Sequence, residues 1–204
     1  MKPGRICSLT ILALLLCSFP MKGTEIVWNK QDSLIYEDYI QRFSGQKNKP
    51  LNELIINTAK YFIGKPYVAS TLESSDDMQP IINLREFDCT TFVEMCIALS
   101  GVIKSRDYSQ DNLSLLVSLI RYRDETPKGY TSRLHYTTDW IFENEEKGVL
   151  KDLSLELGGK NLFKKINFMS SRPELYQHLK DNPKNVEEIR KIEKVINERN
   201  SYNI

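Results

Sequence analysis

The sequence predicts an α+β domain with a helix-rich N-terminal half and a small or incomplete antiparallel sheet. Apolar residues recur at helical spacing along much of the chain, whereas the candidate extended segments are few and short. The length of 204 residues suffices for one domain with its own core, and the 41% apolar fraction is that of a globular protein. These observations exclude a disordered chain and favour a single folded unit.

The predicted helices have recognisable start and stop signals. Helices are expected over residues 33–43, 51–63, 88–101, 113–123, 140–147 and 186–199. Gly64 and Pro66 end the second of them, and Asp88 begins the third. The last helix should be amphipathic, with its inward face formed by Ile189, Ile192, Val195 and Ile196.

Two segments lack a helical pattern. Residues 130–136 follow a Pro127/Gly129 turn and are expected to be extended. Residues 149–157 form a strand or a loop that Gly158 and Gly159 interrupt. Any sheet must therefore be small.

The first residues resemble a secretory signal. Lys2 and Arg5 precede an apolar run, Ile6–Cys17, that is too short to span a bilayer. We expect cleavage between Ser18 and Thr24, so that residues 1–24 are a signal peptide. A buried N-terminal helix is the alternative interpretation.

Export defines the compartment of the mature domain, residues 25–204. The protein is expected in the periplasm or outside the cell, because no later stretch is apolar enough to span a membrane. A lipid anchor on Cys17 is disfavoured, since Leu16 stands where the lipoprotein pattern has a small residue. We expect a monomer.

Charge and histidine content exclude several classes of function. The 28 basic and 27 acidic residues nearly cancel, which argues against a nucleic-acid partner. His135 and His178 lie 43 positions apart and match no metal-ligand spacing, so neither a metal nor another cofactor is predicted. Glu73, Asp76 and Asp77 form either a solvated loop or a contact for a ligand amine.

The two cysteines of the mature domain are predicted to be free thiols. Cys89 and Cys96 are seven residues apart on one helix, which separates their Cα atoms by about 10 Å, beyond disulfide reach. A free thiol in an exported protein is usually buried or catalytic. Cys96 falls on the apolar face, and we interpret it as a core residue.

Cys89 is the candidate nucleophile. Asp88 is a good N-cap, which places Cys89 at the first helical position. Unpaired backbone N–H groups and the helix dipole favour an anion there, and they can also stabilise an oxyanion. These residues alone leave open whether Cys89 is a nucleophile or another buried thiol.

Several motifs together resemble a known family. Phe62–Val68 contains Gly-x-Pro-Tyr, and Asp88-Cys89-Thr90-Thr91-Phe92-Val93 follows it, as in NlpC-type peptidoglycan hydrolases. The segment Tyr122–Trp140, with Arg123-Asp124 and then Gly129–Trp140, is similar to the N-acetylmuramoyl-L-alanine amidase-like branch, as are Gly158-Gly159 and Ile166–Ser170. The resemblance covers about residues 50–204.

The resemblance implies a papain-like fold and an amidase that cuts the bond between N-acetylmuramic acid and L-alanine in muropeptides or peptidoglycan fragments. It maps the family nucleophile onto Cys89. The implied substrate-binding residues are Tyr67, Asp88, Arg133, Tyr136, Asp139 and Trp140. For Trp140, stacking on a sugar and a place in the core remain alternatives.

The catalytic base is the open question. In the family the base is expected on a strand beyond the last helix seen here, so the chain resembles a C-terminally truncated member. Either the base is lacking and the chain is an inactive muropeptide-binding remnant, or His135 is the base. A dipeptide-releasing cell-wall endopeptidase of the same superfamily is a further alternative.

Overall fold

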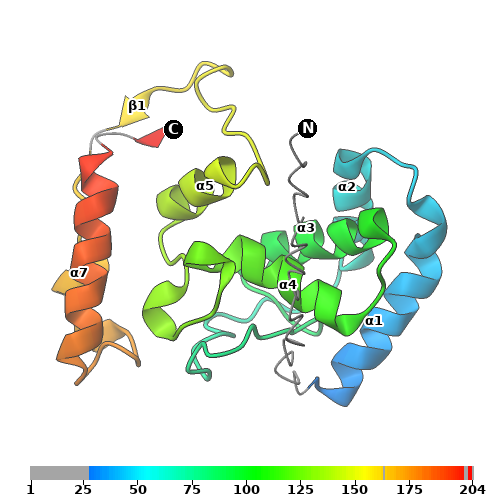
Figure 1. The fold of residues 1–204 in the computed structure, drawn as a ribbon, viewed down its shortest axis with the longest axis horizontal. Coiled ribbons are helices and arrows are strands. Elements are labelled where there is room, and N and C mark those ends of the chain that lie inside the picture. Colours follow the sequence, from blue (N-terminus) through cyan, green and yellow to red (C-terminus); the bar gives the residue numbers. More distant parts are fainter. Residues whose placement is uncertain (1–27, 163, 200–201, 204) are drawn as a thin grey trace, which may run out of the picture.

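The computed structural model describes residues 28–162, 164–199 and 202–203. Figure 1 shows their arrangement. The helices are α1 (Lys30–Phe43), α2 (Leu51–Tyr61), α3 (Cys89–Ser105), α4 (Gln110–Arg121), α5 (Thr137–Glu146), α6 (Phe168–Ser171) and α7 (Pro183–Glu198). Short 3-10 turns are η1 (Ser44–Gln46), η2 (Arg123–Glu125), η3 (Tyr130–Ser132) and η4 (Pro173–Leu175), and the strands are β1 (Asn161–Leu162) and β2 (Tyr202–Asn203).

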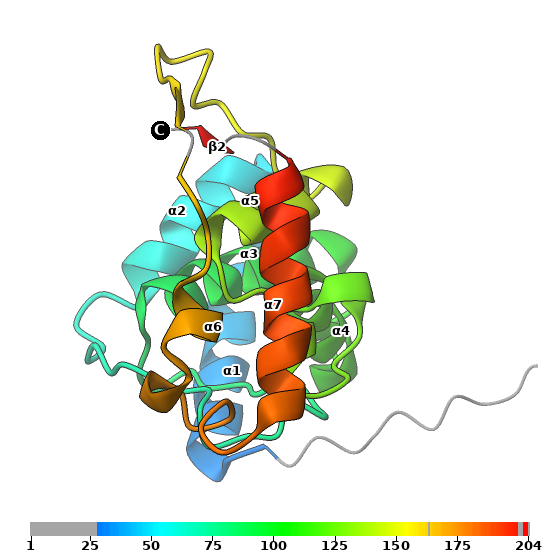
Figure 2. The same ribbon diagram turned by 90° about the vertical axis from the view of Figure 1, so that its left-hand side faces the viewer.

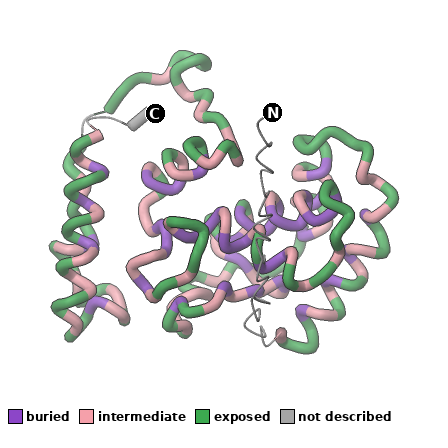
Figure 3. The backbone as a smooth tube through the Cα atoms, viewed as in Figure 1, coloured by how far each residue is buried: buried purple, intermediate pink, exposed green. Residues whose placement is uncertain are grey.

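Helices α1 to α5 surround the main core. α3 packs against both α2 and α4, and its residues Met95, Leu99, Val102 and Ile103 are almost fully buried. Figure 3 shows buried positions concentrated in this region, with exposed positions on the outer faces. The apolar stripe of each amphipathic helix is thereby removed from water, which is the main stabilising contribution to such a body.

α3 begins abruptly at a capped residue. The Asp88 carboxylate accepts a hydrogen bond from the backbone N–H of Thr91 at 2.8 Å, and the Thr91 hydroxyl accepts one from the backbone N–H of Asp88 at 3.0 Å. This reciprocal capping box satisfies two donors and fixes the helix start at Cys89. The predicted cap and the predicted first residue are both confirmed.

The C-terminal arm, residues 164–199, contains α6, η4 and α7. Figure 2 shows α6 beside α7 on one face of the molecule. A second apolar cluster joins the arm to the segment after α4, and its buried members are Tyr130, Met169, Leu179 and Ile189. The arm therefore has a small core of its own rather than an extension of the main one.

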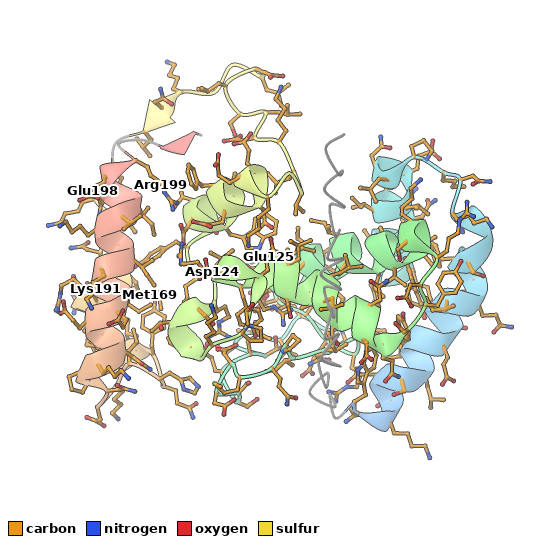
Figure 4. All side chains as sticks on the ribbon, in the orientation of Figure 1. Asp124, Glu125, Met169, Lys191, Glu198 and Arg199 are labelled. Atoms are coloured by element: carbon orange, nitrogen blue, oxygen red, sulfur yellow. The ribbon has the colours of Figure 1, made fainter. Side chains whose placement is uncertain are left out.

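An ion cluster of Arg123, Asp139, Glu143 and Arg199 also holds the arm. Arg199 at the end of α7 donates to Asp139 at 2.7 Å and to Glu143 at 2.9 Å. Arg123 donates to the same two carboxylates at 2.5 and 2.9 Å. Figure 4 labels Arg199 on the side of α7 that faces α5. The cluster thus ties η2, α5 and α7 together.

In the described residues, far fewer residues belong to strands than to helices. β1 and β2 form one antiparallel pair with Asn161 opposite Asn203 and Leu162 opposite Tyr202. The expectation of a helix-rich domain with little sheet is confirmed.

No helix in the described part of the chain combines the length and apolarity needed to cross a membrane. The proposed signal peptide, residues 1–24, lies outside the described residues.

The local predictions had mixed outcomes. Within residues 130–136, Tyr130–Ser132 form the 3-10 turn η3, whereas the predicted extended backbone occurs at Arg133, which bridges Tyr122, and at Tyr136. Residues 149–157 form a loop, which is one of the two predicted alternatives. Val195 is 49% exposed rather than inward, since α7 contacts the body over a narrow stripe that includes Ile189 and Ile196. For Val195, the exposure is decided by the part of the body that packs against α7, and the local sequence pattern does not contain that information.

Candidate active site

Cys89 lies exposed at the first position of α3. The orphan N–H groups of the first helical turn converge there, and the positive end of the helix dipole favours an anion. The thiol is free, as predicted, and so is Cys96. Cys89 is therefore reachable from solvent and placed where backbone donors can meet developing negative charge.

Cys89 opens into a groove with a volume of about 260 Å³. The walls come from the start of α3 and from the segment that enters α5. The lining residues are Cys89, Thr90, Val93, Leu134, His135, Thr137, Trp140 and Ile141. The groove beside the thiol is therefore lined mainly by apolar side chains. A ligand bound there would be partly shielded from water.

His135 shares this groove with Cys89. Its Nε2 lies 2.8 Å from the carbonyl oxygen of Tyr130. A carbonyl only accepts, so Nε2 carries the proton and Nδ1 is the nitrogen left free to accept one. Between these two described residues, no hydrogen bond joins Cys89 Sγ to the imidazole. The Sγ atom lies 4.0 Å from Thr90 Oγ1.

The environment keeps His135 neutral. Burial, followed by the positive charge of Arg133, lowers the pKa of His135 from 6.5 to about 3. The ring also packs against Tyr130, with centroids 4.4 Å apart. At neutral pH the imidazole is therefore an uncharged acceptor.

Trp140 forms the inner wall of the groove and is held from behind by α3. Its indole N–H donates to Glu94 Oε1 at 3.2 Å, and Glu94 Oε2 accepts from Arg121 Nε at 2.7 Å. Glu94 and Arg121 are both 1% exposed. Trp140 is thus a core residue that also lines the groove, and its stacking on a sugar stays a prediction.

Arg133 and Tyr136 bind other parts of the protein and do not line the groove. Arg133 is buried and pairs with Glu73 at 2.6 Å and with Asp77 at 3.6 Å. The Tyr136 hydroxyl donates to Glu193 of α7 at 2.6 Å.

The interpretation of Asp77 as part of a solvated loop was wrong, because its side chain is fully buried between Arg133 and Tyr122.

Asp139 and Tyr67 lie at opposite extremes of exposure. Asp139 is 1% exposed and belongs to the ion cluster, so the structure does not bring it to the groove. Tyr67 is 70% exposed and forms an isolated bridge with Phe87, two residues before Cys89. Asp88 acts as the helix cap described above. Of the predicted site residues, the groove therefore joins Cys89, His135 and Trp140.

Sequence reasoning missed Glu94 and the residues Leu134, Thr137 and Ile141. A signal existed for Glu94, since it is an acidic residue on the apolar side of the predicted α3 helix, where a carboxylate needs a buried partner. Leu134 lies in the segment predicted to be extended, and Thr137 lies before the predicted start of the next helix, so the sequence pattern did not place them on one face with Ile141. No group of His, Cys, Asp or Glu suited to a metal ion occurs among the described residues.

Thiol labelling should separate the two cysteines. Burial raises the pKa of Cys96 to about 12, which leaves a thiolate fraction on the order of 10⁻⁵ at pH 7. Iodoacetamide is expected to modify Cys89 at least ~100-fold faster than Cys96 in the folded protein, measured by peptide mass spectrometry over time. Unfolding in urea should remove most of the difference. Equal rates in the folded protein would contradict the exposed position of Cys89.

His135 should make stability depend on pH. Its pKa is about 3 when folded and 6.5 in the reference state, so between these values the unfolded chain binds more protons. The free energy of unfolding should fall as pH falls below 6.5, by up to about 1.4 kcal/mol per unit from this residue. Urea unfolding of the wild type and His135→Gln at pH 5 to 7.5 isolates the contribution. Parallel curves would show that His135 titrates normally in the fold.

Comparison with known proteins identifies the family. The profile of the N-acetylmuramoyl-L-alanine amidase-like family matches residues 57–202. An N-acetylmuramoyl-L-alanine amidase from Bacteroides uniformis has 36% identity and a TM-score of 0.67, with 72% of this chain and 61% of that one covered. The helix-rich fold described above is thus that of an amidase-like protein. The chain belongs to the N-acetylmuramoyl-L-alanine amidase-like family.

Two further solved structures extend the comparison. A Bacteroides fragilis protein with a provisional xylanase name has 38% identity and a TM-score of 0.64, covering 69% of this chain and 61% of its own. A Legionella pneumophila protein shares the fold at 16% identity and a TM-score of 0.57, covering 85% of this chain and 62% of its own. The chain therefore spans about 61% of the length of its Bacteroides relatives. No curated protein sequence matches it.

Proposed function

We propose that this protein is a cysteine-dependent N-acetylmuramoyl-L-alanine amidase of the papain-like NlpC type that acts on muropeptides. The observation that carries the proposal is the exposed Cys89 at the capped start of α3, in a groove shared with His135. Family membership supports a peptidoglycan-type substrate. It also supports a role outside the cytoplasm, where a signal peptide over residues 1–24 would deliver the chain.

The chemistry follows from the position of the sulfur. The Cys89 thiolate attacks the lactyl carbonyl carbon, and backbone N–H groups of the first α3 turn stabilise the oxyanion. The C–N bond then breaks, the alanine nitrogen takes up a proton and leaves as an amine, and a thioester remains on Cys89. Water hydrolyses the thioester and restores the thiol. His135 Nδ1 is the proposed proton carrier for the thiol and the leaving amine.

The proposed substrate contacts are Trp140, on the groove wall, and Tyr67, which is exposed and forms an isolated bridge with Phe87, two residues before Cys89. An aromatic face suits the apolar side of a sugar ring. Arg133, Tyr136 and Asp139 are left out of the proposed contacts, because each is paired inside the protein and does not line the groove.

The groove also bears on the xylanase name of one relative. Glycoside hydrolysis requires a pair of carboxylic acids across the scissile bond. Among the described residues that line the Cys89 groove, none is Asp or Glu. The groove therefore suits an attack by sulfur on an amide better than acid–base cleavage of a glycosidic bond.

One observation favours a second candidate, a muropeptide-binding protein that does not turn over its ligand. His135 does not hydrogen-bond Cys89, and its pKa of about 3 makes it a weak base. A thiol without an effective partner imidazole reacts slowly. In this case the wild type would bind muropeptides as tightly as Cys89→Ala does and would release no product.

Mass analysis of a muropeptide digest distinguishes the candidates. Incubation with an N-acetylmuramoyl tetrapeptide is expected to release the intact tetrapeptide and the free sugar acid. An enzyme that leaves this substrate intact but releases an L-alanyl dipeptide from the free tetrapeptide would instead be the dipeptide-releasing endopeptidase. Binding in calorimetry with neither product would identify the binding protein, and the absence of both binding and product would refute the proposal.

A further inference from the structure

A second groove lies away from Cys89, between the first turn of α1 and the loop of residues 71–86. Its volume is about 550 Å³. It shares no lining residue with the Cys89 groove. The polar side chains that decide its chemistry are those of Trp28, Asp32, Thr71, Asp76, Arg85 and Glu86.

Asp32 is the unusual residue of this groove. It is 1% exposed, and its Oδ1 accepts from the backbone N–H of Leu84 at 2.9 Å and from Arg85 Nε at 3.1 Å. Its other carboxylate oxygen, Oδ2, is buried and has no partner among the described residues. A buried carboxylate oxygen without a donor is unfavourable, so Asp32 is a ready acceptor for a donor that enters the groove.

Two buried donors lie in the same lining. The indole N–H of Trp28 and the hydroxyl of Thr71 also have no partner among the described residues. Each can donate to an oxygen of a ligand. The groove therefore offers one anionic acceptor and two neutral donors that no described residue satisfies.

The charge of the lining selects the donor. Asp32, Asp76 and Glu86 contribute three carboxylates, against the one guanidinium of Arg85. A neutral hydroxyl gains little from this negative field, whereas an ammonium group gains from each carboxylate. The Trp28 and Thr71 donors then require an oxygen acceptor on the same ligand.

We propose that this groove binds a ligand with a primary ammonium group next to a carbonyl oxygen, as in the amino terminus of a peptide. The ammonium donates to Asp32 Oδ2, and the carbonyl oxygen accepts from Trp28 and Thr71. The site is separate from the Cys89 groove, so binding here does not depend on the amidase activity. Its volume admits a short peptide rather than a single small ion.

Calorimetry with trialanine amide tests the proposal, and N-acetyl-trialanine amide is the matched ligand without the charge. The wild type is expected to bind the free amine at least tenfold more tightly. Asp32→Asn keeps the acceptor for Leu84 but removes the charge, and should weaken binding at least tenfold. Glu37→Gln removes an equal charge from the exposed side of α1 and should change the affinity less than twofold.

The outcomes are distinct. Equal affinity for the two peptides, no binding by the wild type, unchanged binding by Asp32→Asn, or preference for N-acetylglucosamine over the free amine each overturns the proposal. If Asp32→Asn does not fold, Trp28→Phe and Thr71→Val remove the donors separately and should each weaken binding about threefold to tenfold. All measurements are repeated in the Cys89→Ala background, so that loss of the amidase proposal leaves this test intact.

Discussion

Replacing Cys89 by alanine is expected to lower the rate of muropeptide hydrolysis by at least about 10³-fold. The change removes the only atom proposed to form a covalent bond with the substrate. Cys89 is exposed at the helix start, and the Asp88–Thr91 capping box does not involve its side chain. Folding should therefore be unaffected, and the loss should appear in kcat with little change in muropeptide affinity. Rates come from chromatography of the released peptide, and affinity from calorimetry.

Cys96→Ala is the matched control for this prediction. It removes the other free thiol of the described residues, from the core instead of the groove. Its cost is the loss of a small buried side chain, about 1 kcal/mol of stability, and its turnover should stay within twofold of the wild type. A Cys89→Ala protein that retains more than a tenth of the wild-type rate would exclude Cys89 as the nucleophile.

The position of Cys89 at the capped start of α3 could be predicted because it depends on neighbours in sequence. Asp88, Cys89 and Thr91 form the helix cap among themselves, so residue type and spacing determine the geometry. The burial of Cys96 follows from the same helix, seven residues later. Both predictions rest on local rules and are confirmed by the structure.

The surroundings of Cys89 could not be predicted in the same way. Asp139 was predicted to bind substrate, but Arg199, 60 residues away, reaches it and buries it in the ion cluster. His135 lines the groove, and the 3-10 turn η3 precedes it within residues 130–136, which were predicted to be extended. Such contacts depend on which distant element packs alongside, and a single sequence does not contain that information.

Breaking the buried ion pair behind the groove should be the most damaging change to stability. Glu94→Leu leaves the Arg121 guanidinium, which is 1% exposed, with the Ile81 carbonyl at 2.7 Å as its one remaining hydrogen-bond partner among the described residues. Burial lowers the pKa of Arg121 while Glu94 raises it, and the net shift is upward, so the cation persists in the wild type. An unpaired buried cation costs about 3–5 kcal/mol of unfolding free energy, measurable by urea titration.

The double variant separates the pair from the packing around it. Glu94→Leu with Arg121→Met removes both charges and keeps similar volume, so its loss should be smaller than that of Glu94→Leu alone, with a coupling energy of at least about 2 kcal/mol. Glu187→Ala, which breaks an exposed pair with Arg190, should cost less than about 0.5 kcal/mol. Additive losses would mean that the two charges do not interact in the fold.

The same pair also connects stability to the groove. Trp140 donates to Glu94 Oε1, and Glu94 Oε2 accepts from Arg121. Arg121 therefore fixes the Glu94 carboxylate, and this carboxylate in turn fixes the indole on the groove wall. In the double variant Trp140 keeps its packing but loses its acceptor. If this hydrogen bond positions the indole for substrate, the double variant should raise KM for the muropeptide several-fold while the Cys89 labelling rate stays unchanged. An unchanged KM would show that packing alone positions Trp140.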